Sequence, residues 1–284
     1  MSGTSPTVRQ RELGIRLRAL RNERGMTVEA VAEKLLCSAT KISRLETAAR
    51  RPSLRDVRDL CALYEVDEPT SAEFMRLARE AREQGWWTEY EDLGLDPLIG
   101  LEQEATAMTS FSMSWMPGLL QTEGYARGII QIVAPKMNPQ IVDQRTEARM
   151  RRQQLLENDQ RPHYSVLLDE VVLRRGVGEP MLMAAQLDKV LTFISNGYAT
   201  VQVIPFAAGA YAAIDAYFVL LEFGDESDLW PVIFVEGQTG IQYFKRKSDI
   251  TRYRETISYL RDRALDPGGS AELIEKVRES YIKQ

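Results

Sequence analysis

The stretch from Thr27 to Pro52, which reads TVEAVAEKLLCSATKISRLETAARRP, decides the fold of the first part of the chain. Its apolar residues recur at spacings of three and four, which places them on one face of a helix. Thr27 can accept a hydrogen bond from the free N–H groups of a first helical turn, and Ser38 can do so for a second helix. The stretch therefore predicts two short helices that are joined by a tight turn and bury their apolar faces together. These faces carry Val28, Val31, Ala32, Leu35, Ile42 and Leu45.

The second predicted helix, about residues 38–47, has a polar side opposite Ile42 and Leu45. Its arginine and lysine can donate to guanine or to phosphate, and its hydroxyl groups can bond to either target. Arg50 and Arg51 follow at the exit of the helix, where they are suited to neutralise phosphate. The pattern predicts a helix-turn-helix unit that reads the major groove of double-stranded DNA, and the alternative is a helical hairpin with a solvated basic face. The residues expected at DNA are Thr27, Ser38, Thr40, Lys41, Ser43, Arg44, Arg50 and Arg51.

Several motifs in this region resemble the xenobiotic-response-element family of Cro/cI-like DNA-binding domains. They are Leu17-Arg18-x-x-Arg21, Gly25-Met26-Thr27, Ala32, Ile42-Ser43-Arg44-Leu45-Glu46 and Pro52-Ser53. The resemblance implies that Ile42 and Leu45 are core residues and that the positions around Arg44 face the bases. Leu36 and Ala48 depart from the family, because both stand where glycine is usual. A positive φ at Ala48 would cost on the order of 1 kcal/mol, which favours a helix that continues for a residue or two.

Charge is divided unevenly along the 284 residues, which together carry a formal net charge of −5. Residues 1–60 hold 13 Lys and Arg against 7 Asp and Glu, a balance of +6. The remainder holds 23 against 34, a balance of −11. A compact basic module joined to an acidic body suits DNA binding through one surface, because the rest of the molecule is repelled.

The composition also indicates the cellular compartment. No apolar run approaches the length of about 18 residues that a transmembrane helix needs, so no membrane contact is expected. The first residues, MSGTSPTVRQRE, lack the apolar region of a secretory signal. Cys37 and Cys61 are the only cysteines and both fall in helical patterns, which favours two buried thiols in a reducing cytoplasm.

The first part of the chain is expected to be an all-α helix-turn-helix domain of five helices over residues 1–84. Helical spacing runs from Arg9 to Arg24, and cap signals at Ser53 and Thr70 introduce later helices. Residues 85–100 read as a junction that Trp86 and Trp87 anchor, since its acidity disfavours base stacking on these rings.

Residues 101–284 predict an α+β domain with a small, mostly antiparallel sheet, and not a parallel nucleotide-binding fold. The expected strands are 164–172, 199–206, 217–223, 232–236 and 241–244. The expected helices are 101–114, one from Glu123, 138–158, one from Pro180, 249–265 and one after Ser270. The helix 138–158 contains Arg145, Arg149, Arg151 and Arg152. Interleaved acidic residues favour a solvated or ion-paired face there over a second nucleic-acid contact.

Motifs in this second part resemble the C-terminal domain of antitoxin-like helix-turn-helix regulators that are abundant in actinobacteria. They are Pro117-Gly118-Leu119-Leu120-Gln121-Thr122, Tyr125-Ala126, Arg149-x-x-Arg152-Gln153, Asp169-Glu170, Leu173-Arg174-Arg175, Val177-Gly178, Gln186-Leu187 and Val201-Gln202-Val203-Ile204-Pro205-Phe206. The resemblance implies a transcriptional regulator that is often encoded beside a small partner protein, and it names no ligand.

The sequence argues against an enzyme, and it predicts no catalytic residue, no metal site and no cofactor. His163 is the single histidine, so a zinc site with the usual ligands is not available. No G-x-S-x-G element presents a serine nucleophile, and Gly176-Val177-Gly178 lacks the rest of a dinucleotide fingerprint. Asp169 and Glu170 adjoin on an expected strand, where they would point to opposite faces and could not share a substrate.

Three functional interpretations stay open for the C-terminal part. It can pair two copies into a homodimer, because one module of this size reads only a few base pairs. It can sense a small-molecule effector in an apolar pocket, or it can bind a small partner protein. The candidate pocket residues are Tyr198, Phe206, Tyr211, Tyr217 and Tyr243.

Overall fold

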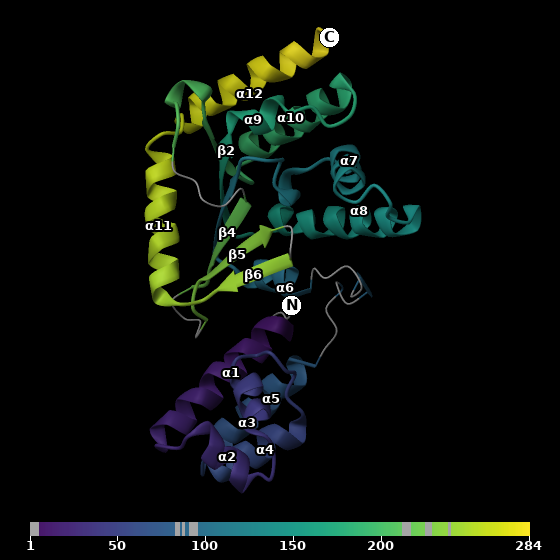
Figure 1. Cartoon of the computed structure of the whole chain (residues 1–284). Coiled ribbons are helices and arrows are strands. Elements are labelled where there is room, and N and C mark those ends of the chain that lie inside the picture. Colours follow the sequence, from purple (N-terminus) through teal and green to yellow (C-terminus); the bar gives the residue numbers. More distant parts are fainter. Residues whose placement is uncertain are drawn as a thin grey trace. The chain divides into compact units, whose positions relative to one another are not determined.

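The computed structural model describes residues 6–82, 86, 89–90, 96–211, 217–224, 229–237 and 240–284 (Figure 1). The chain divides into two compact units. The N-terminal unit comprises Met1–Glu91, Leu95–Glu104 and Gly224–Leu229, and the C-terminal unit comprises Asp92–Gly94, Ala105–Phe223 and Trp230–Gln284. Within the described ranges, none of the helices combines the length and the apolar character that a membrane crossing needs.

The N-terminal unit is all-helical, as the sequence predicts. Its helices are α1 (Pro6–Glu23), α2 (Val28–Lys34), α3 (Ala39–Glu46), α4 (Leu54–Leu63), α5 (Glu68–Glu80) and α6 (Asp96–Glu104). The expected number of five is therefore wrong, because α6 clusters with this unit. The expected helix 101–114 is also wrong, since α6 ends at Glu104 and a strand begins at Ala107.

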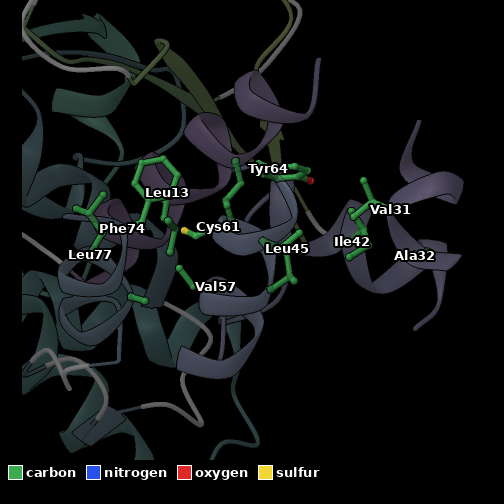
Figure 2. Packing of buried hydrophobic residues seen from close by; sticks show 13 residues of the cluster. Leu13, Val31, Ala32, Ile42, Leu45, Val57, Cys61, Tyr64, Phe74 and Leu77 are labelled. Atoms are coloured by element: carbon green, nitrogen blue, oxygen red, sulfur yellow. The ribbon is translucent and has the colours of Figure 1, made fainter. Parts of the chain in front are cut away.

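One apolar core holds helices α1 to α5 together. Leu13, Ile42, Tyr64 and Leu77, from four different helices, are each at most 1 % exposed. Figure 2 shows these side chains converging with Val31, Leu45, Val57, Cys61 and Phe74. Burial of one large aliphatic or aromatic side chain stabilises the folded state by about 1.5–3 kcal/mol. Because the helices must cross so that these side chains meet, the shared core sets their crossing angles.

In the N-terminal unit, side-chain caps begin α2, α3 and α4 where the sequence places them, and α5 is an exception. Thr27 accepts from the N–H of Ala30, and Ser38 accepts from the N–H of Lys41. Ser53 and Asp56 form a reciprocal capping box at α4. The start expected at Thr70 is wrong, because Asp67 caps α5 and the helix begins at Glu68.

Left-handed residues end helices α1 to α4. Gly25 has φ +61°, and Leu36, Ala48 and Glu65 have φ values of 52°, 56° and 51°. At α2 the N–H of Cys37 donates to Ala32 O at 2.9 Å, which completes the usual left-handed cap. The expected helical continuation at Ala48 is therefore wrong, and three non-glycine residues adopt a conformation that favours glycine.

A six-stranded mixed sheet forms the centre of the C-terminal unit, in the order β3-β2-β1-β4-β5-β6. Its strands are β1 (Ala107–Ser112), β2 (His163–Asp169), β3 (Thr200–Ile204), β4 (Tyr217–Glu222), β5 (Val232–Gly237) and β6 (Gly240–Phe244). Strands β1, β2 and β3 pair in parallel, whereas β4 to β6 continue from β1 antiparallel. The prediction of a mostly antiparallel sheet is wrong, because helical crossovers connect β1 to β2 and β2 to β3.

The other elements of this unit are helical. They are η2 (Gly118–Leu120), α7 (Glu123–Val133), α8 (Pro139–Gln153), η3 (Gln154–Glu157), α9 (Glu170–Arg174), α10 (Pro180–Ser195), η4 (Phe206–Ala208), α11 (Lys247–Arg261) and α12 (Pro267–Ile282). The expected strand 164–172 ends early, because Asp169 accepts from the N–H of Val171 and so caps α9. The last helix starts at Pro267, before the expected position, with Asp266 as its cap.

The two faces of the sheet differ in their covering. Helix α11 packs on one face, where Ile257 and Leu260 join a cluster that includes Phe111 and Phe218. Figure 1 shows α11 on one side of the strands and α7 and α8 on the other. The register places Tyr217, Phe234 and Tyr243 on the face away from α11, because each alternates with a residue of the α11 cluster.

Candidate DNA-binding interface

Helix α3 has one buried side and one exposed side. Ile42 and Leu45 are 1 % and 3 % exposed in the shared core. Thr40, Ser43 and Arg44 lie on the opposite side and are exposed to solvent. The structure thus presents hydroxyl and guanidinium groups on a helix whose position is set by its apolar side.

A buried ion pair fixes the end of α3 to α1. The Arg21 guanidinium donates to both carboxylate oxygens of Glu46, with Nε–Oε1 2.6 Å and Nη2–Oε2 2.9 Å. Arg21 also donates from Nη1 to the Met26 carbonyl at 2.8 Å, which ties the entry to α2 into the same contact. The hydrogen bond to Glu46 raises the pKa of Arg21, so the guanidinium keeps its positive charge.

Gly14 allows α1 to approach the end of α3 at close range. A Cβ atom at this position would lie 2.8 Å from the carbonyl oxygens of both Leu45 and Glu46. Backbone atoms cannot move aside as a flexible side chain can, so a larger residue would displace α3.

Lys41 lies against α4 instead of projecting freely from α3. Its Nζ donates to Asp56 Oδ1 at 2.5 Å, and its side chain is 28 % exposed. Burial works to raise the pKa of Asp56, but hydrogen bonds from Lys41 and Ser53 outweigh it, and the pKa is lowered overall. The sequence contains both residues but no signal that pairs them, and Asp56 is absent from the expected interface.

The other expected residues retain exposed polar groups. The hydroxyl oxygens of Thr27 and Ser38 accept backbone N–H groups at 3.1 and 3.2 Å, which leaves their protons available to donate. Arg44 Nη2 lies 3.4 Å from the Ala49 carbonyl, at the limit of a hydrogen bond. Arg50 and Arg51 are exposed in the segment after α3.

Arg55 is a further exposed cation on the N-terminal unit, and it is not among the residues that the sequence predicts at DNA. It stands in the first turn of α4, two residues after the Ser53 cap, and its side chain is 83 % exposed. Its Nε lies 3.5 Å from Asp59, a surface contact that is weak in water. The signal that could have found it is an arginine two residues after the Pro52-Ser53 motif.

The five aromatic candidates for an effector pocket do not come together. Tyr217 and Tyr243 flank Phe234 on the sheet face away from α11, with centroid distances of 6.3 and 5.7 Å. Tyr211 joins the α11 cluster, and its hydroxyl donates to Asp169. The remaining two are separate, because Tyr198 packs edge-on against Phe193 and Phe206 is 57 % exposed.

The residues considered as catalytic or metal-binding candidates lie at the surface or take part in helix caps and ion pairs. His163 is exposed at the start of β2, as the surface interpretation predicts. Asp169 and Glu170 do not share a strand, because Glu170 begins α9 and pairs with Arg174 at 2.7 Å. Among the described residues, no group of three or more His, Cys, Asp or Glu side chains is placed to hold a metal ion.

Two other expectations concern the junction and α8. Trp86 contacts Tyr90 edge-on, with centroids 6.1 Å apart, whereas Trp87 lies outside the described residues. Arg152, part of the expected solvated or ion-paired face of α8, is 8 % exposed and so is not solvated. Arg149 of the same face donates to the neutral side chain of Gln121.

Comparison with known families separates the same two parts of the chain. A family model described as a helix-turn-helix domain matches residues 12–74, which contain α2, the turn and α3. This match supports DNA binding and transcription regulation. Neither the curated proteins nor the solved structures contained a match to the chain.

A second family model, described as a domain of unknown function (DUF5753), matches residues 95–276. The match takes in the whole six-stranded sheet and the helices from α7 to α11. It extends over more than half of the sequence, and the chain therefore belongs to the DUF5753 family, with a helix-turn-helix domain ahead of the family's own region.

Proposed function

We propose that the chain is a sequence-specific transcriptional regulator of the Cro/cI-like type that places α3 in the major groove of DNA. The exposed face with Thr40, Ser43 and Arg44 is the observation that supports this proposal most. Arginine can bond to guanine in two places, and the hydroxyl groups can bond to bases or phosphates. Arg50, Arg51 and the thirteen-to-seven excess of cations in residues 1–60 supply attraction to phosphate.

The regulator acts as a homodimer in this proposal. One helix-turn-helix unit contacts only a few base pairs, so two copies on half-sites about one helical turn apart would supply the missing specificity. The C-terminal unit has apolar surface for pairing, because Ile132 and Val133 at the end of α7 are 62 % and 61 % exposed. We infer a non-catalytic role for this unit, since the candidate catalytic residues serve as caps, ion pairs or surface groups.

A small partner protein is the second candidate for the same apolar surface. Ile141 near the start of α8 is 39 % exposed, and α7 and α8 are joined by the ion pair between Arg127 and Asp143. Exposed aliphatic residues on adjoining helices favour a protein contact over a solvated surface. This candidate agrees with the antitoxin-like resemblance of the C-terminal motifs.

Selection from random duplex DNA tests the proposal directly. The full-length protein should enrich one two-fold symmetric motif at about 0.15 M salt, and sedimentation should give twice the chain mass. Enrichment of no motif over bulk competitor would reject sequence-specific binding. A monomer that still binds one motif would reject only the homodimer.

A further inference from the structure

A buried polar frame in the C-terminal unit holds the loop around η2. Gln121 donates from Nε2 to the Met116 carbonyl at 2.6 Å, and Gln153 donates to the carbonyls of Gly118 and Gln121 at 2.7 and 2.8 Å. Lys189 of α10 donates to the same Gln121 carbonyl at 2.9 Å. Side chains from α8 and α10 therefore satisfy the backbone of this loop and fix its position.

Arg149 projects from α8 into this frame. Its Nη1 donates to Gln121 Oε1 at 2.8 Å, which is a neutral acceptor. Burial, together with the neighbouring charges of Arg152 and Arg145, lowers the pKa of Arg149 to about 10, while Glu236 and Tyr217 oppose this shift. The guanidinium is thus enclosed by protein beside Arg152 and Arg145, and its hydrogen-bond acceptor is an uncharged amide.

The hydrogen-bonding capacity of the cluster exceeds what the surrounding protein uses. A guanidinium carries five N–H donors, and Gln121 is the one hydrogen-bond acceptor of Arg149 among the described residues. The Nε atom of Arg145 is also buried without an acceptor in the described part of the chain. A buried N–H donor without an acceptor is costly, and a guanidinium whose acceptor is a neutral amide can still take an anion, so Arg149 and Arg145 indicate a place that an anion completes.

We propose that Arg149 and Arg145, braced by Gln121, form a binding site for a small molecule that bears a carboxylate or phosphate group. A guanidinium presents two parallel donors that match either group, which makes arginine the residue suited to this contact. Gly118 covers the cluster closely, because a Cβ there would lie 3.6 Å from Arg152 Nη1 and 3.8 Å from Arg149 Nε.

This inference goes beyond the proposed DNA-binding function and does not depend on it. All of the residues involved lie in the C-terminal unit, and the test contains no DNA. An anion at this site would also stabilise the position of η2 relative to α8, which gives the unit a ligand-dependent state.

The test measures the melting temperature and calorimetric binding of the full-length protein with three probes. Sodium phosphate, sodium acetate and disodium succinate are each compared with sodium chloride at equal ionic strength. At least one probe should raise the melting temperature in a saturable way, and Arg149→Gln should weaken its apparent Kd at least tenfold. Arg149→Lys should weaken it less, because the charge remains. Response to phosphate alone assigns a phosphoryl ligand, and response to acetate or succinate assigns a carboxylate.

Two further variants make the result decisive. Arg145→Gln removes a neighbouring charge but no hydrogen bond of the η2 frame, and it should weaken binding of the same probe. Arg252→Gln removes an exposed arginine of α11 and should leave binding unchanged. No saturable response of the unmodified protein to any probe would overturn the proposal. A response that survives both Arg149→Gln and Arg145→Gln would also overturn it, because Arg149 would then serve only to hold Gln121.

Discussion

The Arg21 side chain on α1 and the Glu46 side chain at the end of α3 form a two-point ion pair with side-chain exposures of 10 % and 5 %. The pair joins the last turn of α3 to α1, the longest helix of the N-terminal unit. Because both charges are buried, neither partner can be removed without leaving the other uncompensated.

Glu46→Ala should lower the free energy of unfolding of the N-terminal unit by about 3–5 kcal/mol, because it leaves the Arg21 charge buried and unpaired. Urea denaturation followed by circular dichroism measures this change. The matched control is Glu279→Ala, which breaks the exposed pair with Lys283 and should change stability by less than about 0.5 kcal/mol. Equal effects of the two substitutions would contradict the structural role of the buried pair.

Gly14→Ala should destabilise the protein by about 1–3 kcal/mol, although alanine is the better helix former. The added methyl group would meet the carbonyl oxygens of Leu45 and Glu46 at 2.8 Å and would displace α3. Gly268→Ala is the control, because its Cβ would meet only Asp266 Oδ1 at 3.5 Å. Thermal unfolding should show a loss for Gly14→Ala alone, and a gain at both positions would refute the close approach.

Leu36→Gly should stabilise the protein by about 1 kcal/mol, because it relieves a left-handed residue with φ 52°. The side chain is 94 % exposed, so little packing is lost. Gly25→Ala is the reciprocal test, since a Cβ at φ +61° meets nothing within 4 Å and adds only backbone strain. It should destabilise by a similar amount, and either a destabilising Leu36→Gly or a stabilising Gly25→Ala would disprove the assignment of strain.

Asp56→Asn should release Lys41 from α4 and make it available to phosphate. The slope of log K against log salt for DNA binding should steepen by about 0.9, the value for one more neutralised phosphate. Fluorescence anisotropy at several salt concentrations measures this slope. An unchanged slope would mean that Lys41 already leaves Asp56 when DNA binds.

The same pair predicts a pH effect on stability. The pKa of Asp56 is below its ordinary value of 3.8 in the folded state, so the folded state binds this proton more weakly than the unfolded chain. The stabilisation is present above pH 3.8 and is lost as the pH falls through the folded-state pKa. The loss of stability on acidification should therefore be smaller in Asp56→Asn than in the unmodified protein.

Arg44→Ala and Arg51→Ala should weaken DNA binding in different ways. Arg44→Ala should cost about 1–3 kcal/mol on the selected motif and relax base choice, if this arginine reads a guanine. Arg51→Ala should weaken all duplexes about equally and reduce the salt slope by about one. Arg76→Ala on α5, which breaks an exposed pair with Glu80, is the control for both. Unchanged affinity of Arg44→Ala would remove α3 from the proposed base-reading role.

Local sequence patterns predicted the helix-turn-helix unit well. Thr27, Ser38 and Ser53 are all confirmed as caps, and Ile42 and Leu45 are confirmed as core residues. These features depend on contacts within three or four residues along one helix, which a sequence displays directly. The same patterns failed at Ala48, which takes φ 56° at the end of α3 although alanine prefers the helical region, and the N–H of Arg50 then donates to the Arg44 carbonyl at 3.0 Å.

The sheet shows where local patterns end. The sequence predicts helix where the structure has strand β1. Nearly all residues of this strand are buried, so the alternation of apolar and polar residues that marks a strand is absent. Its partners β2 and β4 lie more than fifty and one hundred residues away in the sequence. Nothing in the strand itself indicates whether those partners run parallel or antiparallel.

The sequence alone determined the helices α1 to α4, the caps at Thr27, Ser38 and Ser53, the basic charge of residues 1–60 and the exposed polar face of α3. Only the tertiary structure decided which charges meet: Arg21 with Glu46, Lys41 with Asp56, and Arg149 with the η2 loop. The physical reason is that helix periodicity is a local property, whereas an ion pair or a buried cation depends on how distant segments are brought together. Identical arginine patterns can thus face solvent on one helix and enter the interior from another.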